Sequence, residues 1–229
     1  MTDVSIATDD DSITAALEVP AGAGPWPGVV IVHDAFGLGR DHRDITRRVA
    51  DHGYLALSPD LYARGGRAKC VRTVFGDLMR RRGRTVGDIV AARDHLAGHE
   101  DCTGKVAVAG FCLGGGFALI VAPQGFDAAA PFYPSMTGSV DSVLDGTCPI
   151  VASLGRLDPL NIGTGQKLQD GLDRRGIPHD VHTYPHAGHS FANKVPGSAV
   201  TRFVGLGYDA DASDDAWRRV FAFFDTHLR

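Results

Sequence analysis

Short apolar runs rich in valine, isoleucine and alanine alternate along this chain with amphipathic segments, and no other feature restricts its fold as much. The apolar runs predict β-strands at 28–34, 54–60, 105–110, 126–133, 149–155 and 179–185. The spacing of apolar residues predicts helices at 41–53, 85–99 and 213–228, the last of which opens with a Ser-Asp-Asp sequence typical of a helix N-cap. Such alternation predicts an α/β fold with a mostly parallel central sheet and helices on both faces. Ligands of such folds bind at the carboxyl ends of the strands.

The length and charge of the chain favour a single-domain protein without a nucleic-acid or membrane partner. With 229 residues, 44% of them hydrophobic, the chain can bury a large core, and we expect a single domain over residues 1–229. The formal net charge of -4 disfavours a nucleic-acid partner. The first residues are acidic, unlike a secretory signal, and no window reaches the roughly 18 apolar residues of a membrane span. We therefore expect a cytoplasmic protein, either a monomer or a small homo-oligomer, with no membrane partner.

The cysteines and histidines do not predict a metal site. Four cysteines stand far apart with no Cys-x-x-Cys pair: Cys70, Cys102, Cys112 and Cys148. This spacing indicates neither a disulfide framework nor a zinc ribbon. His182, His186 and His189 are close in sequence, but His182 lies in a predicted strand, where its side chain need not converge with the others. We expect no metal and no cofactor.

Cys112 stands in a turn that an ordinary core cysteine does not need. The predicted strand at 105–110 runs into Gly-Phe-Cys-Leu-Gly at 110–114, after which the chain is apolar again. This matches the Gly-x-Ser-x-Gly nucleophile elbow, whose tight strand-to-helix turn leaves no room for β-carbons at the glycines, with cysteine in place of serine. A lone cysteine is more often a small buried hydrophobe. The flanking glycines favour a nucleophile instead, and a helix N-terminus would make the thiol more acidic.

Two further residues complete a possible catalytic triad. Asp158 follows the predicted strand at 149–155, and His189 follows the one at 179–185, so each belongs to a loop at the carboxyl end of a strand. Taken alone, Asp158 would be a turn residue before Pro159 and His189 an ordinary loop histidine. In this fold the triad residues occur in the order nucleophile, acid, histidine, which is the order seen here. The joint pattern favours Cys112, Asp158 and His189 as catalytic residues.

Four motifs together resemble those of the dienelactone hydrolases, a cysteine branch of the α/β-hydrolase fold. They are HDAFGL at 33–38, SPDLYARGG at 58–66, GFCLGG at 110–115 and AGHSFAN at 187–193, and the resemblance covers nearly the whole chain. It implies the α/β-hydrolase fold and hydrolysis of an ester or lactone bond, of the carboxymethylenebutenolidase type, through a thioester acyl-enzyme. Cys112 would be the nucleophile, His189 the general base and then acid, and Asp158 the residue that holds the imidazole.

The resemblance also implies roles for the loop after the first predicted parallel strand. The backbone N–H groups of Ala35 and Leu113 would form the oxyanion hole, which stabilises the negative charge of the tetrahedral intermediate. The family places a carboxylate from this loop near the thiol, and Asp34 occupies that position. The dienelactone hydrolases have glutamate there, and aspartate is one methylene shorter. An ordinary loop acid bonded to the backbone is the alternative interpretation of Asp34.

The substrate is less well defined by the sequence. The family binds a substrate carboxylate through arginines, for which Arg72 is the better match and Arg64 a rival, whereas the Arg80–Arg82 triplet is interpreted as a solvated helix face. Where the family motif reads H-S-F-A-R, this chain has Asn193. Asn193 is predicted to face the substrate from that position, but it cannot grip a carboxylate with two charged bonds. Phe36 and Tyr133 are predicted to line an apolar pocket, with core packing as the alternative. The glycine-rich segment 194–212 is interpreted as either a cap or a surface loop.

Three other functions compete with hydrolysis of dienelactone-like substrates. A general carboxylesterase acting on uncharged esters would fit the missing arginine. A redox-sensing protein would use the same activated thiol, oxidised reversibly. A nucleotide-binding module fits poorly, because neither glycine-rich phosphate-binding motif is present.

Overall fold

Eight strands form one sheet in the computed structural model, which describes residues 1–136, 138–194 and 207–229. The strands are β1 (Thr2–Ala7), β2 (Ser12–Glu18), β3 (Trp26–Val32), β4 (Leu55–Pro59), β5 (Cys102–Phe111), β6 (Ala128–Phe132), β7 (Ile150–Gly155) and β8 (His179–Tyr184). Their order across the sheet is β1-β2-β4-β3-β5-β6-β7-β8. The six neighbouring strands β4, β3, β5, β6, β7 and β8 pair in parallel. Strand β2 is antiparallel to both of its neighbours, β1 and β4. The expected mostly parallel sheet is therefore confirmed.

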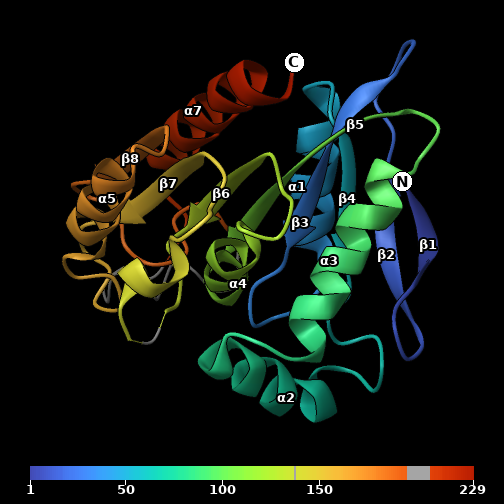
Figure 1. Cartoon of the computed structure of the whole chain (residues 1–229), viewed down its shortest axis with the longest axis horizontal. Coiled ribbons are helices and arrows are strands. Elements are labelled where there is room, and N and C mark those ends of the chain that lie inside the picture. Colours follow the sequence, from blue (N-terminus) through green and yellow to red (C-terminus); the bar gives the residue numbers. More distant parts are fainter. Residues whose placement is uncertain (137, 195–206) are drawn as a thin grey trace.

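Helices cover both faces of this sheet (Figure 1). They are α1 (Arg40–Asp51), α2 (Arg67–Arg80), α3 (Arg84–Ala97), α4 (Leu113–Val121), α5 (Thr164–Arg175) and α7 (Ala210–Leu228), together with the short 3-10 helix η1 (Val140–Val143). Buried residues of α3, α4 and α5 join the apolar cluster on one face, and those of α1 and α7 join the cluster on the other. Alternate residues of the central strands supply the two clusters, as period-two side-chain alternation requires: Val30 and Val32 of β3 belong to the first, Val29 and Ile31 to the second.

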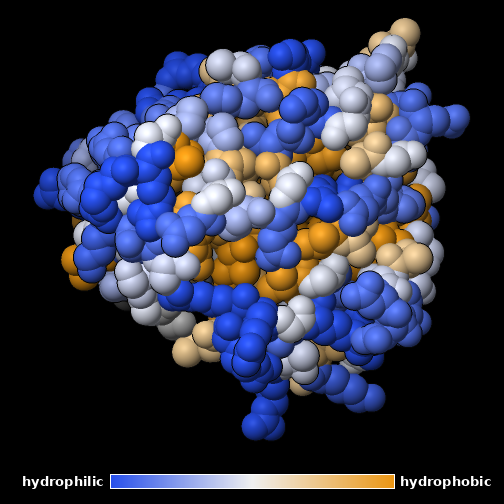
Figure 2. Space-filling view, viewed as in Figure 1, coloured by the Kyte–Doolittle hydropathy of each residue, from blue (hydrophilic) through white to orange (hydrophobic). Residues whose placement is uncertain are grey.

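The surface is mainly polar on the face seen in Figure 1. Figure 2 shows hydrophilic residues over most of this face and a band of hydrophobic residues that reaches the surface near its centre, over the position of α3 and α4. Among the described residues, no helix is long and apolar enough to cross a membrane.

The predicted elements correspond to observed ones, but the prediction was incomplete. All six predicted strands and three predicted helices are present, whereas the hairpin of β1 and β2 and the helix α5 were not predicted. The Ser-Asp-Asp cap is wrong: α7 begins earlier, at Ala210, where the Asp209 side chain accepts a hydrogen bond from the Ala212 N–H at 3.1 Å. Ser213 is buried within the first turn of this helix. Most of the segment interpreted as a cap or surface loop, residues 195–206, lies outside the described residues.

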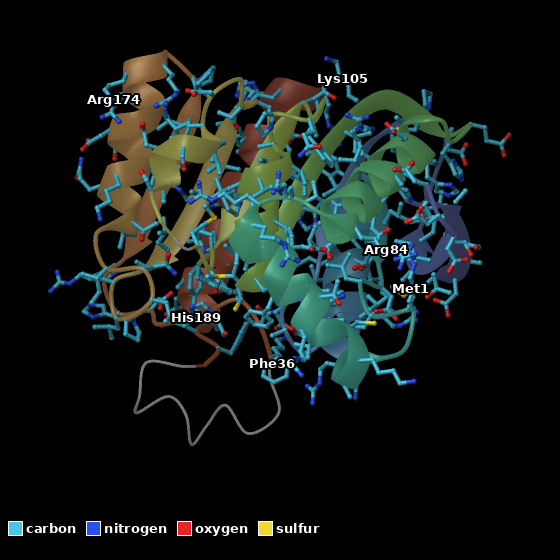
Figure 3. The ribbon with its side chains drawn as sticks, turned by 60° about the horizontal axis from the view of Figure 1, so that its bottom comes forward. Met1, Phe36, Arg84, Lys105, Arg174 and His189 are labelled. Carbon is cyan, nitrogen blue, oxygen red and sulfur yellow. The ribbon has the colours of Figure 1, made fainter. Side chains whose placement is uncertain are left out.

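The carboxyl ends of the parallel strands gather the loops that carry the sequence-predicted site. Cys112 follows β5, Asp158 follows β7 and His189 follows β8. Figure 3 shows Phe36, from the loop after β3, and His189 along the same edge of the molecule. The topology therefore places the loops of all four residues at one rim of the sheet.

Candidate active site

Cys112 occupies a sharp turn between β5 and α4. Its backbone dihedrals are φ 54° and ψ -114°, a conformation that non-glycine residues avoid and that functional sites often retain. Three backbone hydrogen bonds fix it: the Cys112 N–H donates to Phe132 O at 3.1 Å, and Cys112 O accepts from the N–H groups of Ser135 and Gly116 at 2.8 and 3.1 Å. The strain is thus balanced by bonds to β6, to the chain that follows β6 and to α4.

The glycines on either side of this turn are required by close backbone contacts. A β-carbon on Gly110 would lie 2.0 Å from Gly114 O, and one on Gly114 would lie 2.2 Å from Val32 O. Both separations are far below van der Waals contact, and the crowding atoms are backbone atoms that cannot rotate away. The sequence-based interpretation of 110–114 as an elbow therefore has a direct steric basis.

His189 and Asp158 form a buried pair beside the turn. The Nδ1 atom of His189 lies 2.7 Å from Oδ2 of Asp158, and both residues are buried. The Asp158 carboxylate also accepts from the Leu160 N–H at 2.9 Å and from Asn161 Nδ2 at 2.7 Å. These bonds orient the carboxylate toward the imidazole and leave Nε2 as the free end of the ring. Asn161 was not predicted, although an amide three residues after a turn aspartate is a usable signal.

Burial and charge act in opposite directions on the pKa values of this pair. Burial alone would lower the pKa of His189, but the hydrogen bond that it donates to Asp158 and the neighbouring Cys112 sulfur outweigh this effect and raise the pKa to about 9. Burial would raise the pKa of Asp158, yet the bonds from His189 and Asn161 keep it below its usual value. The Asp158 carboxylate and the Cys112 sulfur thus favour the imidazolium form of His189 near neutral pH.

The thiol lies close to His189 but is turned toward a hydroxyl group. Cys112 Sγ is 3.4 Å from Ser135 Oγ. His189 Nε2 is buried and makes no hydrogen bond of normal geometry with any described residue. The thiol is therefore near enough to His189 to raise its pKa, but the two groups are not aligned for a hydrogen bond. Such misalignment is common in unliganded active sites. Ser135, which follows β6, was not identified from the sequence.

The expected contact between Asp34 and the thiol is not formed. Asp34 Oδ1 accepts from the Phe36 N–H at 2.8 Å, and Oδ2 lies 3.6 Å from His42 Nε2. The short side chain is thus engaged within its own loop and with α1, which agrees with the alternative interpretation as a loop acid. His42 is a buried residue of this region that the sequence analysis missed.

The backbone N–H groups of Ala35 and Leu113, which were predicted to form the oxyanion hole, have no hydrogen-bond acceptor among the described residues. Ala35 lies in the loop after β3, and Leu113 is the first residue of α4. Their loops meet at the elbow, where Gly114 approaches Val32 and His33.

Tyr133 and Asn193 are buried and bonded to each other, so the prediction that both face the substrate is not supported. The Tyr133 hydroxyl donates to Asn193 Oδ1, and Asn193 Nδ2 donates to Asp41 Oδ2 at 2.7 Å. The Tyr133 ring packs 5.2 Å from the His189 ring. Both side chains are fully buried, so this chain of bonds links β6, the loop after β8 and α1 beneath the site.

Arg64 is not brought to the site. Its guanidinium makes two bonds to the Asp88 carboxylate, at 2.6 and 3.0 Å, and one to Thr8 Oγ1 at 2.8 Å. It therefore ties the end of β1 to α3. Arg72, by contrast, is exposed on α2 and has no ion pair within the described residues.

Phe36 is 61% exposed, and the Arg67 guanidinium lies 5.9 Å from its ring centre. It borders a cavity of about 800 Å³ beside the loop after β3. Neither Cys112 nor His189 lines this cavity, and its polar or charged lining residues are Asp34, Arg40, Asp41, His42, Asp44 and Lys194. No group of three or more His, Cys, Asp or Glu side chains within the described residues could hold a metal ion.

Comparison with known proteins decides the family. The sequence model of the dienelactone hydrolase family matches residues 13–228. This chain belongs to the dienelactone hydrolase family. A carboxymethylenebutenolidase of Pseudomonas putida is 29% identical over 220 residues, which cover 89% of this chain and 91% of that protein. As a member of the family, the chain is a carboxylic ester hydrolase.

Solved structures agree with this assignment. A dienelactone hydrolase-like promiscuous phosphotriesterase, P91, from metagenomic libraries is 26% identical with a TM-score of 0.83, and the match covers 100% of this chain and 98% of that one. A dienelactone hydrolase from Anabaena variabilis, at 20% identity, has a TM-score of 0.70 over 100% of this chain and 98% of that one, which bears on the fold alone. The α/β-hydrolase fold of this member of the dienelactone hydrolase family is confirmed.

Proposed function

We propose that this hydrolase cleaves an ester or lactone through a covalent thioester on Cys112. Cys112 gives its proton to His189 Nε2 before the substrate reacts, as the raised pKa of His189 favours, and the resulting thiolate attacks the carbonyl carbon to form a tetrahedral oxyanion. When this species collapses, the carbon–oxygen bond to the leaving group breaks, and His189 returns its proton to the leaving oxygen. His189 then takes a proton from water, whose oxygen attacks the thioester. Collapse of this second intermediate breaks the carbon–sulfur bond and releases the carboxylic acid, which restores the Cys112 thiolate and the protonated His189.

The main support is the 2.7 Å bond between Asp158 and His189 next to a strained cysteine turn. Asp158 fixes the tautomer that leaves Nε2 toward the reacting atoms, and it stabilises the imidazolium that forms during each half-reaction. The N–H groups of Ala35 and Leu113 would bind the oxyanion. Each donor of this kind is worth about 10²- to 10³-fold in rate.

The acyl-enzyme itself is the sharpest test. Rapid mixing with p-nitrophenyl acetate should give a burst of p-nitrophenolate equal to the enzyme concentration. Acid-quenched protein should carry one acetyl group on the peptide that contains Cys112, and neutral hydroxylamine should remove it, as it does from thioesters. An acetyl group on serine, or turnover without any label on Cys112, would contradict the proposal.

The raised pKa of His189 predicts how activity depends on pH. Because His189 titrates at about 9 and must protonate the leaving group, kcat/KM should fall above about pH 9. In Asp158→Asn this fall should move to lower pH, since the carboxylate is one of the groups that raise the His189 pKa. The stabilising effect of the charged imidazole is complete below its unfolded pKa of 6.5, so the free energy of unfolding should decrease as the pH rises through about 9. Rate profiles and urea titrations across this range measure both effects.

Arg72 is proposed to bind a carboxylate on the substrate. Replacing it with alanine should raise KM about fivefold to tenfold for aryl esters that carry a carboxylate and leave KM for neutral aryl esters unchanged. Arg64→Ala is the matched control: it removes the Asp88 ion pair, so it should lower the melting temperature without changing this preference. If Arg72→Ala changes neither class of ester, a general carboxylesterase acting on uncharged esters becomes the better description. The oligomeric state and the cytoplasmic location stay predictions.

A further inference from the structure

A buried histidine lies beneath the loop that carries Ala35, and the mechanism above does not use it. His42 is the third residue of α1 and is 2% exposed. Its ring packs edge-on against Phe111 of β5, with ring centres 5.4 Å apart, and lies 6.1 Å from the His33 ring. The imidazole is therefore held rigidly between α1 and the strand that leads into the Cys112 turn.

One nitrogen of His42 is bonded and the other is not. Nε2 accepts a hydrogen bond from the Asp34 N–H at 3.2 Å. Since Nε2 is the acceptor, the proton of the neutral ring is on Nδ1, and Nδ1 is buried without a partner among the described residues. A buried donor without a partner destabilises the fold. An apolar side chain would fill the same space without this cost, so the bond made by Nε2 needs an explanation of its own.

That bond belongs to a set that fixes three consecutive peptide groups around Ala35. The Asp34 carboxylate accepts from the Phe36 N–H at 2.8 Å. Asp34 O lies 2.7 Å from His33 Nδ1 and accepts from the Gly37 N–H at 3.2 Å. The Tyr62 hydroxyl donates to Ala35 O at 3.2 Å. Because the peptide unit is planar, fixing Asp34 O also fixes the direction of the Ala35 N–H in the same plane.

We propose that His42 is a positioning residue for the oxyanion hole, which makes this inference dependent on the proposed thioester mechanism. Its Nε2 anchors the peptide that enters the loop and lies 3.6 Å from the Asp34 carboxylate that closes it. Without this anchor, Asp34 can rotate and the Ala35 N–H loses its fixed direction toward the carbonyl oxygen. His42 does not touch the substrate; it acts through Asp34.

Two variants separate this role from simple packing. His42→Leu keeps the volume of the side chain but removes the acceptor, and it should lower kcat for p-nitrophenyl acetate about 10- to 100-fold with KM changed by less than about threefold. His42→Gln places an amide oxygen where Nε2 lies, and it should restore kcat to within about fivefold of the wild type. His52→Leu, at the other end of α1, is the matched control and should leave kcat unchanged.

Alkylation of Cys112 by iodoacetamide provides the decisive second measurement. This displacement forms no oxyanion at a carbonyl carbon, so it depends on the thiol and His189 but not on the Ala35 N–H. His42→Leu should therefore alkylate within about twofold of the wild-type rate while its esterase rate falls. Equal losses in both rates, or a Gln variant as poor as Leu, would overturn the positioning role and leave His42 as a packing residue.

The proposed function can fail separately. If the wild type hydrolyses esters without acetylating Cys112, the thioester mechanism is wrong whatever the His42 variants do. If Cys112 is acetylated and His42→Leu hydrolyses esters like the wild type, only the role of His42 is wrong.

Discussion

Replacing Cys112 with alanine is expected to lower kcat/KM for aryl esters and lactones by about 10⁴-fold or more, because the proposed mechanism has no other nucleophile. The fold should survive, since Cys112 is only partly buried and alanine keeps the β-carbon, which leaves the backbone strain of the turn unchanged. Steady-state hydrolysis of p-nitrophenyl acetate and of small lactones, with melting temperature as a check on folding, measures the effect.

Cys148→Ala is the control for this substitution. Cys148 lies just before β7, where burial raises the pKa of its thiol to about 12 and makes it unreactive at neutral pH. Its removal should leave kcat/KM within about twofold of the wild type while the loss of a partly buried side chain lowers stability slightly. An active Cys112→Ala enzyme would show that hydrolysis occurs by another route.

Gly114→Ala should have the largest effect on stability, lowering the free energy of unfolding by more than about 3 kcal/mol. The added β-carbon would lie 2.2 Å from Val32 O and 2.6 Å from His33 O. To relieve these contacts, α4 must move away from β3, and this movement would carry the Cys112 thiol and the Leu113 N–H with it. Activity should therefore fall even in the fraction of molecules that fold.

Gly87→Ala is a matched control that is expected to raise the free energy of unfolding instead of lowering it. Gly87 is an exposed residue of α3, and nothing lies within 4 Å of the position that its β-carbon would take. Alanine is the better helix former by roughly 0.5–1 kcal/mol, so this variant should be slightly more stable than the wild type. Urea unfolding of both variants tests the comparison. Equal effects at the two positions would mean that the close approach of α4 to β3 is not what requires glycine.

The strands and helices that pack on both sides were predictable, and the N-terminal hairpin was not. The central strands have buried residues at every position, as in Ala128–Phe132, and this gives the unbroken apolar runs that the sequence displays. β1 is an edge strand whose residues are mostly exposed, so acidic and hydroxyl side chains interrupt its apolar pattern. Pairing with β2 and packing of Ile6 into the core, not local preference, make it a strand.

The candidate site was predictable where short motifs carry it and not where distant residues meet. The order of Cys112, Asp158 and His189, together with the glycines of the elbow, was sufficient to place these residues at one edge of the sheet. The buried Asn193 is hydrogen-bonded to Tyr133 and Asp41, which lie 60 and 152 positions away in the sequence. Arg64 was a candidate for the family's carboxylate-binding arginine, but it is bonded to Asp88, which lies 24 positions later in the sequence. Partners of this kind follow from the tertiary fold, which no local pattern reports.

Because α4 is rich in glycine, the reactivity of the Cys112 thiol depends on the folding of the whole chain. This helix has nine residues and begins Leu-Gly-Gly-Gly. A segment this short, with three glycines, does not form a stable helix by itself. Its apolar side chains pack in the core, and its glycines lie against the backbone of β3, β6 and the segment after β6, so the tertiary fold holds it in shape. A chain still emerging from the ribosome, or one unfolded by heat, therefore carries Cys112 as an ordinary flexible thiol. Its nucleophilic character should appear and disappear cooperatively with the whole tertiary structure.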